Sequence, residues 1–253
     1  LIYRKDIFEQ AGVQPPETWD EFRRLAREFH RSADRRYGAI FAAFPDGHNA
    51  IYDFCLQLWT RGGELTDSAG RFQLDSPQAA GALEFLRQTL NDSAAVHPSS
   101  REMDSVQSGL AFAAGEASMM VNWFGFASMA ETVSDSRVKG KVGIAPVPHE
   151  PGFLGTSLNI YWTLSIPACA AHREAAWRFL RHCASPAMDR LLTLEGGIGC
   201  RRSTWADEEV NRVIPFYHKL ESLHSNAREI PCLEQWPKVA QIIDRMVLAA
   251  ING

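Results

Sequence analysis

The sequence predicts an α/β fold, because segments with helical spacing of apolar residues alternate with short apolar segments of strand length along the whole chain. The clearest helix starts lie at Thr18 and Ser76, which are both good capping residues. The clearest strands are the apolar runs 37–43, 117–122 and 142–147. No internal repeat or low-complexity tract interrupts this alternation.

The first predicted helix follows Pro15-Pro16 and begins at Thr18. The Thr18 hydroxyl and the Glu21 carboxylate have the spacing of a capping box, in which each accepts a backbone N–H of the other's residue. The helix is expected to run to about Ser32. Its apolar face is predicted to consist of Trp19, Phe22, Leu25, Ala26 and Phe29.

The next elements follow from turn and capping residues. A buried strand over 37–43 is expected to lead through a loop over 44–50 to a helix over 52–59, which ends at Gly62-Gly63. Residues 66–70 predict a turn between two short strands. Ser76-Pro77 then opens a helix, because Ser caps it and Pro at the first position gives up an unpaired amide. Its buried face is predicted to comprise Ala80, Leu83, Leu86 and Leu90.

The remaining elements continue the pattern to the end of the chain. Strands are predicted over 117–122, 142–147 and 160–166. Helices are predicted over about 104–115, 173–184, 185–196, 207–223 and 236–250. Trp19 and Trp177 both fall on apolar helix faces, so we expect both to lie in the core.

Size and charge narrow the class of protein. A chain of 253 residues with 45% hydrophobic and 22% charged residues suits one large globular domain or two smaller ones. The net charge of −4 and the scattered Lys and Arg residues argue against nucleic acid as a partner. No apolar run reaches the roughly 18 residues that a membrane-spanning helix needs.

Motifs for catalysis and cofactors are missing. There is no Walker loop and no nucleophile elbow, and Gly196-Gly197 lacks the rest of a dinucleotide fingerprint, so it is predicted to end a helix. The histidines show no zinc-ligand spacing. We therefore predict no catalytic residue, metal or cofactor. One disulfide remains open among five cysteines, against the alternative of buried thiols: Cys55, Cys169, Cys183, Cys200 and Cys232.

The order of several short segments resembles one protein family over essentially the whole chain. Residues 1–8 and 11–22, with Pro15-Pro16-Glu17-Thr18-Trp19, resemble the hinge-crossing segment of the family 1 extracellular solute-binding proteins. These are the maltodextrin-binding-like receptors of ABC sugar importers. The further segments follow in the family's order: Gly62-Gly63-Glu64-Leu65, 112–120, 143–148, 175–180 and Gly196-Gly197.

The resemblance implies a periplasmic-binding-protein-like type II clamp of two lobes, here mainly the C-terminal lobe with part of the N-terminal lobe. Residues 1–155 would form the first part of the C-terminal lobe. Residues 156–202 would return to the N-terminal lobe, and 203–253 would supply the closing helices of the C-terminal lobe. A first stretch of the family's N-terminal lobe is absent here, so the 160–166 strand would lack its sheet.

The resemblance further implies a periplasmic or extracellular receptor, with a lipid anchor ahead of Leu1 as an expectation. Such a receptor captures a sugar or oligosaccharide and delivers it to the permease subunits of an ABC importer, and we expect a monomer. Two alternatives stay open. One is a carbohydrate-active hydrolase, which would need two converging carboxylates. The other is the same fold with a non-sugar solute such as a phosphorylated polyol, a polyamine or a peptide, and Arg201-Arg202 is the local pair that an anion would use.

Candidate ligand-binding residues follow from the chemistry of sugars, which present C–H faces to aromatic rings and hydroxyls to polar groups. Tyr52, with Asp46 and Asn49, lies in a segment that aligns with a ligand-contacting loop of the family. Trp123 and Phe124 follow a predicted strand at the family's aromatic cleft position, and we expect at least one of them to lie in the site. The alternative is that one residue of this Trp-Phe-Gly-Phe cluster only fills the core. The other candidates are Trp236 and the small residues at the lobe crossover, Gly155, Thr156 and Ser157.

Overall fold

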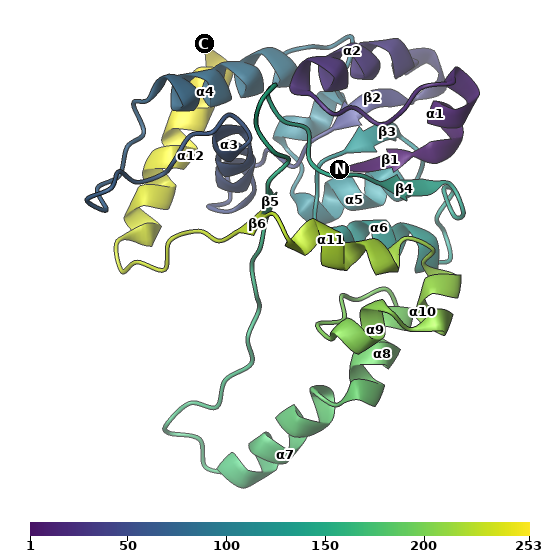
Figure 1. Cartoon of the computed structure of the whole chain (residues 1–253), viewed down its shortest axis with the longest axis vertical. Helices are drawn as coiled ribbons and strands as arrows, with labels where there is room; N and C mark the ends of the chain where they lie inside the picture. The colour runs from purple at the N-terminus through teal and green to yellow at the C-terminus, as the bar shows by residue number, and fades with distance from the viewer.

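The computed structural model describes all 253 residues and is built around a four-stranded sheet in the order β2-β3-β1-β4 (Figure 1). The strands are β1 (Ile2–Arg4), β2 (Tyr37–Ile40), β3 (Ala117–Met120) and β4 (Val142–Ile144). β1 pairs antiparallel with both β3 and β4, whereas β2 and β3 are parallel. Because β2 and β3 are parallel neighbours, the loops that follow them leave from the same edge of the sheet.

The sheet separates two hydrophobic cores. Along β2 and the residue after it, Ala39 and Phe41 lie in one core and Ile40 in the other. Along β3, Met119 and Met120 divide in the same way. This alternation is what a strand with a period of two residues produces when both faces are covered.

The first face of the sheet carries the larger core and five helices. They are α1 (Lys5–Ala11), α2 (Trp19–Phe29), α3 (Asn49–Trp59), α4 (Pro77–Leu90) and α12 (Trp236–Asn252). The predicted capping box at Thr18 is present, and the Ser76 hydroxyl caps α4. α12 returns from the far end of the sequence to pack on both α3 and α4, so the last helix belongs to the same body as the first residues.

The second face is covered by α5 (Ser105–Ala113) and α6 (Phe124–Thr132). Three shorter helices complete this layer: α9 (Arg202–Trp205), α10 (Glu208–Val213) and α11 (Leu220–His224). Val210, Ile214 and Tyr217 are buried in the same core as Ile2 and Ile40. The prediction of a single helix over 207–223 is wrong, because this segment is divided into α10, the 3₁₀ turn Tyr217–Lys219 and α11.

One segment leaves this body and returns to it. The chain departs at β5 (Ser157–Leu158), which pairs in parallel with β6 (Ala227–Arg228) on the returning strand. Beyond β5 an extended stretch leads to α7 (Arg173–Cys183) and α8 (Pro186–Leu194), and α7 lies at the end of the molecule farthest from the sheet (Figure 1). α7 contains no buried residue at all.

The strand predicted over 160–166 is not formed. Tyr161 is 62% exposed, Trp162 95% and Leu164 70%. A strand exists only where a neighbour supplies partners for its backbone N–H and C=O groups, and no neighbour lies beside this stretch. The prediction that Trp177 lies in the core is also wrong, since α7 contacts α8 without burying any residue and Trp177 is 52% exposed.

Other corrections are local. On α4 Leu86 and Leu90 are buried as predicted. The rest of the buried face is rotated by one position, so Ala79 and Phe85 are buried while Ala80 is exposed and Leu83 is only half-buried. The 66–70 turn joins a single bridge between Thr66 and Phe72 instead of two strands. All five cysteines are free, and only Cys55 is buried, so neither the disulfide nor a general burial of the thiols is found. Gly196 does end α8, with a left-handed φ of 92°.

Candidate functional site

Three residues predicted to bind ligand lie where α3 begins, after the strand edge at which β2 ends. Asp46 Oδ1 accepts hydrogen bonds from the backbone N–H groups of His48 and Asn49, each at 2.9 Å. Asp46 Oδ2 accepts a third from the Asn49 side-chain amide at 2.6 Å. The Asp46 carboxylate therefore caps α3, which starts at Asn49 inside the segment predicted to be a loop. Capping also fixes the helix that carries Tyr52.

An aromatic pair forms the centre of the candidate site. The rings of Tyr52 and Trp123 meet edge to face, with centroids 5.5 Å apart and an interplanar angle of 81°. Tyr52 comes from α3, and Trp123 is the residue that caps α6 after β3. Both rings are only partly buried. Burial, with Asp46 and Cys55 as smaller causes, raises the pKa of Tyr52, so its hydroxyl keeps its proton at neutral pH.

Asn122 holds Trp123 in place, and this role was not foreseen in the sequence. Its side-chain amide donates to the Ser105 carbonyl at 2.9 Å and to the Ser108 hydroxyl at 3.0 Å. Its side-chain oxygen accepts the Trp123 backbone N–H at 2.7 Å. The sequence signal was a lone amide at the end of an apolar strand, where a side chain must satisfy backbone groups that the sheet no longer pairs.

Phe124, the other aromatic candidate, points elsewhere. Its ring contacts Phe216 at 5.8 Å and Tyr217 at 5.2 Å, both edge to face. It packs against the second core from its place at the start of α6. The structure thus separates the two neighbours: Trp123 meets Tyr52, and Phe124 meets the core.

The remaining candidates make no aromatic pair or side-chain hydrogen bond with Tyr52 or Trp123. Trp236 opens α12 and packs, half-buried, against the larger core. Gly155 is required by close packing, since a Cβ there would lie 2.3 Å from the Val147 carbonyl oxygen. The Thr156 hydroxyl donates to the Leu154 carbonyl at 3.3 Å, and Ser157 belongs to β5. These three small residues therefore mark the point where the chain leaves the body.

The sequence did not predict two carboxyl groups on or near α3, each of which has an enclosed oxygen without a hydrogen-bond partner. Asp244 on α12 is 9% exposed, and its Oδ1 has no hydrogen-bond partner. Burial raises its pKa, and Asp46 adds to the effect, while the Gly47 amide and His48 oppose it. Asp53 on α3 is half-buried, its Oδ2 is enclosed without a partner, and burial raises its pKa to about 8. The sequence signal for both residues was an acidic residue within the apolar pattern of a helix.

We expect Asp53→Asn to flatten the pH dependence of stability. The unfolded carboxyl loses its proton near pH 4 and the folded one near pH 8, so the folded protein loses stability as pH rises through this window. Asn cannot titrate. Part of the side chain reaches solvent, which reduces the effect. From pH 4 to pH 8 we expect the free energy of unfolding of the variant to rise relative to that of wild type by about 2 kcal/mol.

Urea unfolding at both pH values measures this difference. Asp75→Asn, a change at an exposed acid, is the matched control and should run parallel to wild type. Equal pH slopes for wild type and Asp53→Asn would show that Asp53 is ionised in the folded protein at neutral pH.

No group of three or more His, Cys, Asp or Glu side chains is arranged to hold a metal ion. None of the helices combines the length and the apolar character that crossing a bilayer requires. The candidate site therefore consists of the Tyr52–Trp123 pair and the start of α3, where Asp46 lies close enough to raise the pKa of Tyr52.

Comparison with known proteins shows which family the chain belongs to. The model of the family described as bacterial extracellular solute-binding protein matches residues 1–189, which is most of the chain. The chain belongs to this family. A probable ABC transporter-binding protein of Deinococcus radiodurans is 24% identical over 251 residues, covering 96% of this chain and 59% of its own length. A mannitol-binding protein of Pseudomonas aeruginosa is 25% identical, covering 99% of this chain and 62% of its own.

Solved structures of other proteins share the fold of this chain. A T. maritima protein with maltose bound superposes with a TM-score of 0.91 at 27% identity, covering 99% of this chain and 64% of the other. A solute-binding protein of Agrobacterium radiobacter in complex with ribitol gives 0.87 at 25% identity, covering 100% and 64%. The type II periplasmic-binding-protein fold expected from the sequence is confirmed. The chain spans about three fifths of the length of these relatives.

Proposed function

We propose that this chain is the larger part of a receptor that captures a neutral sugar or polyol outside the cytoplasm and hands it to an ABC import permease. The observation that carries the proposal is the Tyr52–Trp123 pair beside a polar, capped helix start. Aromatic rings pack on the C–H faces of a sugar, while carboxyls and amides pair with its hydroxyls. The proteins that bind maltose, ribitol and mannitol in the comparisons support this ligand class.

The charges around the aromatic pair favour a neutral solute over an anionic one. Asp46, Asp53 and Asp244 lie on or beside α3, and Asp244 and Asp53 each retain an unpartnered oxygen. The raised pKa values of Asp53 and Asp244 favour their uncharged forms, so the charge that a phosphorylated polyol would meet is that of Asp46, which lies close enough to Tyr52 to raise its pKa. Arg201-Arg202, the pair suggested for such an anion, is already engaged, since Arg201 donates to the Ala184 carbonyl and Arg202 pairs with Glu221.

In this proposal residues 1–155 and 203–253 form one lobe, and 156–202 belong to a second. The shared cores support the first grouping, because buried residues of 203–253 join both clusters around the sheet. The exposed stretch from Tyr161 to α7 supports the second, since its apolar side chains are those of a strand and helix that pack in a larger body. β5 and β6, which pair side by side, would be the crossing strands of the hinge (Figure 1).

The mechanism that follows is ligand-driven closure. A solute that contacts both lobes binds the closed form better than the open one, and only this difference in affinity can shift the equilibrium. The permease then meets the closed receptor. Binding without turnover, a monomeric state and an anchor ahead of Leu1 are parts of the proposal that remain predictions.

Chymotrypsin digestion tests the division into lobes. Tyr161, Trp162 and Leu164 are exposed in an extended stretch, so we expect the first cuts of this chain to fall there. Buried aromatic residues such as Trp19 and Tyr217 serve as internal controls and should stay intact. In the longer protein the same sites should be cut at least about tenfold more slowly, because packing closes access to them. First cuts within the sheet body would contradict the proposal.

A further inference from the structure

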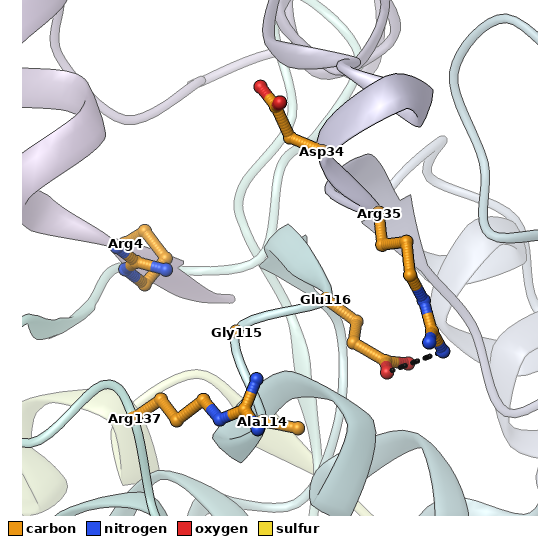
Figure 2. A pocket seen from close by; sticks show the side chains of 7 residues that line it. All are labelled: Arg4, Asp34, Arg35, Ala114, Gly115, Glu116 and Arg137. Carbon is orange, nitrogen blue, oxygen red and sulfur yellow. Dashed lines mark hydrogen bonds and ion pairs between the residues drawn. The ribbon is translucent and has the colours of Figure 1, made fainter.

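A hollow of about 430 Å³ lies at the opposite edge of the sheet from the aromatic pair. β2 and β3 begin at this edge, whereas the candidate solute site follows their other ends. Four residues of β3 separate the two edges, about 13 Å at 3.3 Å per residue. Five of the seven residues that line it are charged: Arg4, Asp34, Arg35, Glu116 and Arg137, with Ala114 and Gly115 completing the lining (Figure 2).

Three guanidinium groups reach this hollow from three separate parts of the chain. Arg4 ends β1, Arg35 precedes β2, and Arg137 lies in the loop after α6. Figure 2 shows them surrounding Gly115 and Glu116. We call this cluster of Arg4, Arg35 and Arg137 the arginine hollow. The fold, and not a run of basic residues in the sequence, therefore brings the three groups to one space.

Much of the donor capacity of these arginines is unused. Arg4 Nε and Nη2 donate to the two Asp6 oxygens at 2.8 and 2.6 Å, which leaves Nη1 free. That Nη1 faces the floor of the hollow, because a Cβ on Gly115 would lie 3.7 Å from it. The Arg4 side chain is only 12% exposed. Arg4 Nη1 itself is not enclosed, so an incoming acceptor can reach it.

The other two arginines differ in their partners. Arg35 Nη2 lies 3.3 Å from Glu116, whose second oxygen lies 3.4 Å from His97 Nε2. The Arg137 side chain makes no hydrogen bond or ion pair, and Figure 2 draws none to it. The Arg137 fork and Arg4 Nη1 therefore remain open toward the same space.

The end of α5 forms the floor of the hollow, and carbonyl groups at a helix end would repel an anion. These carbonyls are already paired. Those of Leu110, Phe112 and Ala111 accept the backbone N–H groups of Ala114, Gly115 and Glu116. The Ala113 carbonyl accepts the Arg137 backbone N–H at 2.8 Å. Arg4 is paired with Asp6 and Arg35 with Glu116, so Arg137 is the arginine of the hollow whose charge has no ion-pair partner.

We propose that the arginine hollow binds an oxyanion of the phosphate type, at a site separate from the solute site. Guanidinium forks match the paired oxygens of such a group, and the open donors of Arg4 and Arg137 would each take one. The volume admits a phosphate that is part of a larger molecule, so a free phosphate compound and a phospholipid headgroup share the required chemistry.

Titration calorimetry with inorganic phosphate at constant ionic strength is the first test. We expect saturable binding that Arg137→Ala weakens at least about tenfold, the usual loss when a charge-assisted hydrogen bond is removed. Arg137 is exposed, so the variant should fold normally, and unchanged thermal unfolding verifies this. Arg212→Ala is the matched control, an exposed arginine outside the hollow, and should bind phosphate as wild type does.

Vesicles distinguish the two sources of the oxyanion. Co-sedimentation with phosphatidylglycerol but not phosphatidylcholine vesicles, reduced by Arg137→Ala but not Arg212→Ala, assigns the hollow to a lipid headgroup. Phosphate binding without co-sedimentation assigns it to a free phosphate compound. The proposal is overturned if neither probe binds, or if Arg137→Ala and Arg212→Ala change binding equally, because general charge screening would then explain the result.

Discussion

Replacing Trp123 with alanine is expected to weaken sugar or polyol binding by the full-length receptor at least about tenfold. Trp123 is the larger ring of the pair with Tyr52, and it follows β3 with its side chain only partly buried. Removing an aromatic anchor of this kind costs about 2 kcal/mol or more of binding free energy, and 1.4 kcal/mol is a factor of ten in Kd. Titration calorimetry of wild type and variant measures the change.

Two further variants sharpen this test. Trp205→Phe removes a tryptophan that stacks on His224 at 5.3 Å, on a different part of the molecule, and should leave the affinity unchanged. Asn122→Ala should weaken binding to a smaller degree, because it releases the Trp123 backbone without removing the ring. An unchanged Kd in Trp123→Ala, with the variant folded, would place the ligand elsewhere on the receptor.

Replacing Trp19 with alanine is expected to lower the free energy of unfolding by about 3–5 kcal/mol. Trp19 is 1% exposed and packs edge to face on Phe22, with Phe85 also in contact. Its Nε1–H donates to the buried Thr60 hydroxyl at 2.9 Å. The substitution leaves a large cavity between α2 and α4 and removes the donor to that hydroxyl. Urea unfolding followed by circular dichroism measures the loss.

Trp177→Ala is the matched control for Trp19→Ala. Trp177 is 52% exposed on α7, so in this chain we expect a change within about 0.5 kcal/mol. Similar losses at both positions would show that α7 is packed in the isolated chain. The same substitution in the longer protein should become costly if α7 joins a second lobe, which makes the pair informative about the proposed lobe division as well.

Features that depend on residues close together in the sequence were predicted correctly. The capping box at Thr18, the Ser76 cap, the apolar spacing of α2 and the glycine end of α8 depend on residues within one or two turns, and all of them are present. The predictions for 160–166 and Trp177 failed because burial depends on what lies across the contact, and that information is not in the local pattern. The rotated face of α4 has the same origin, since α12 arrives from more than 140 residues away.

The candidate site was foreseen in part. Segment order placed Tyr52 and Trp123 in the candidate site, and the structure brings the two rings together. The capping role of Asp46 and the separation of Phe124 from Trp123 required the actual backbone path. Asp53, Asp244 and Asn122 could not be identified from spacing, because their environment is set by contacts between distant segments: α12 with the start of α3, and α5 with the end of β3.

Titration calorimetry of the full-length protein with a panel of neutral sugars and polyols, with chromatography of the solute afterwards, tests the central claim most directly. The proposed receptor function predicts saturable binding of at least one neutral member, no binding of its phosphorylated form, and recovery of the solute unchanged. Conversion of the solute into products would contradict the receptor function, and tighter binding of the phosphorylated form would contradict the assignment of a neutral ligand.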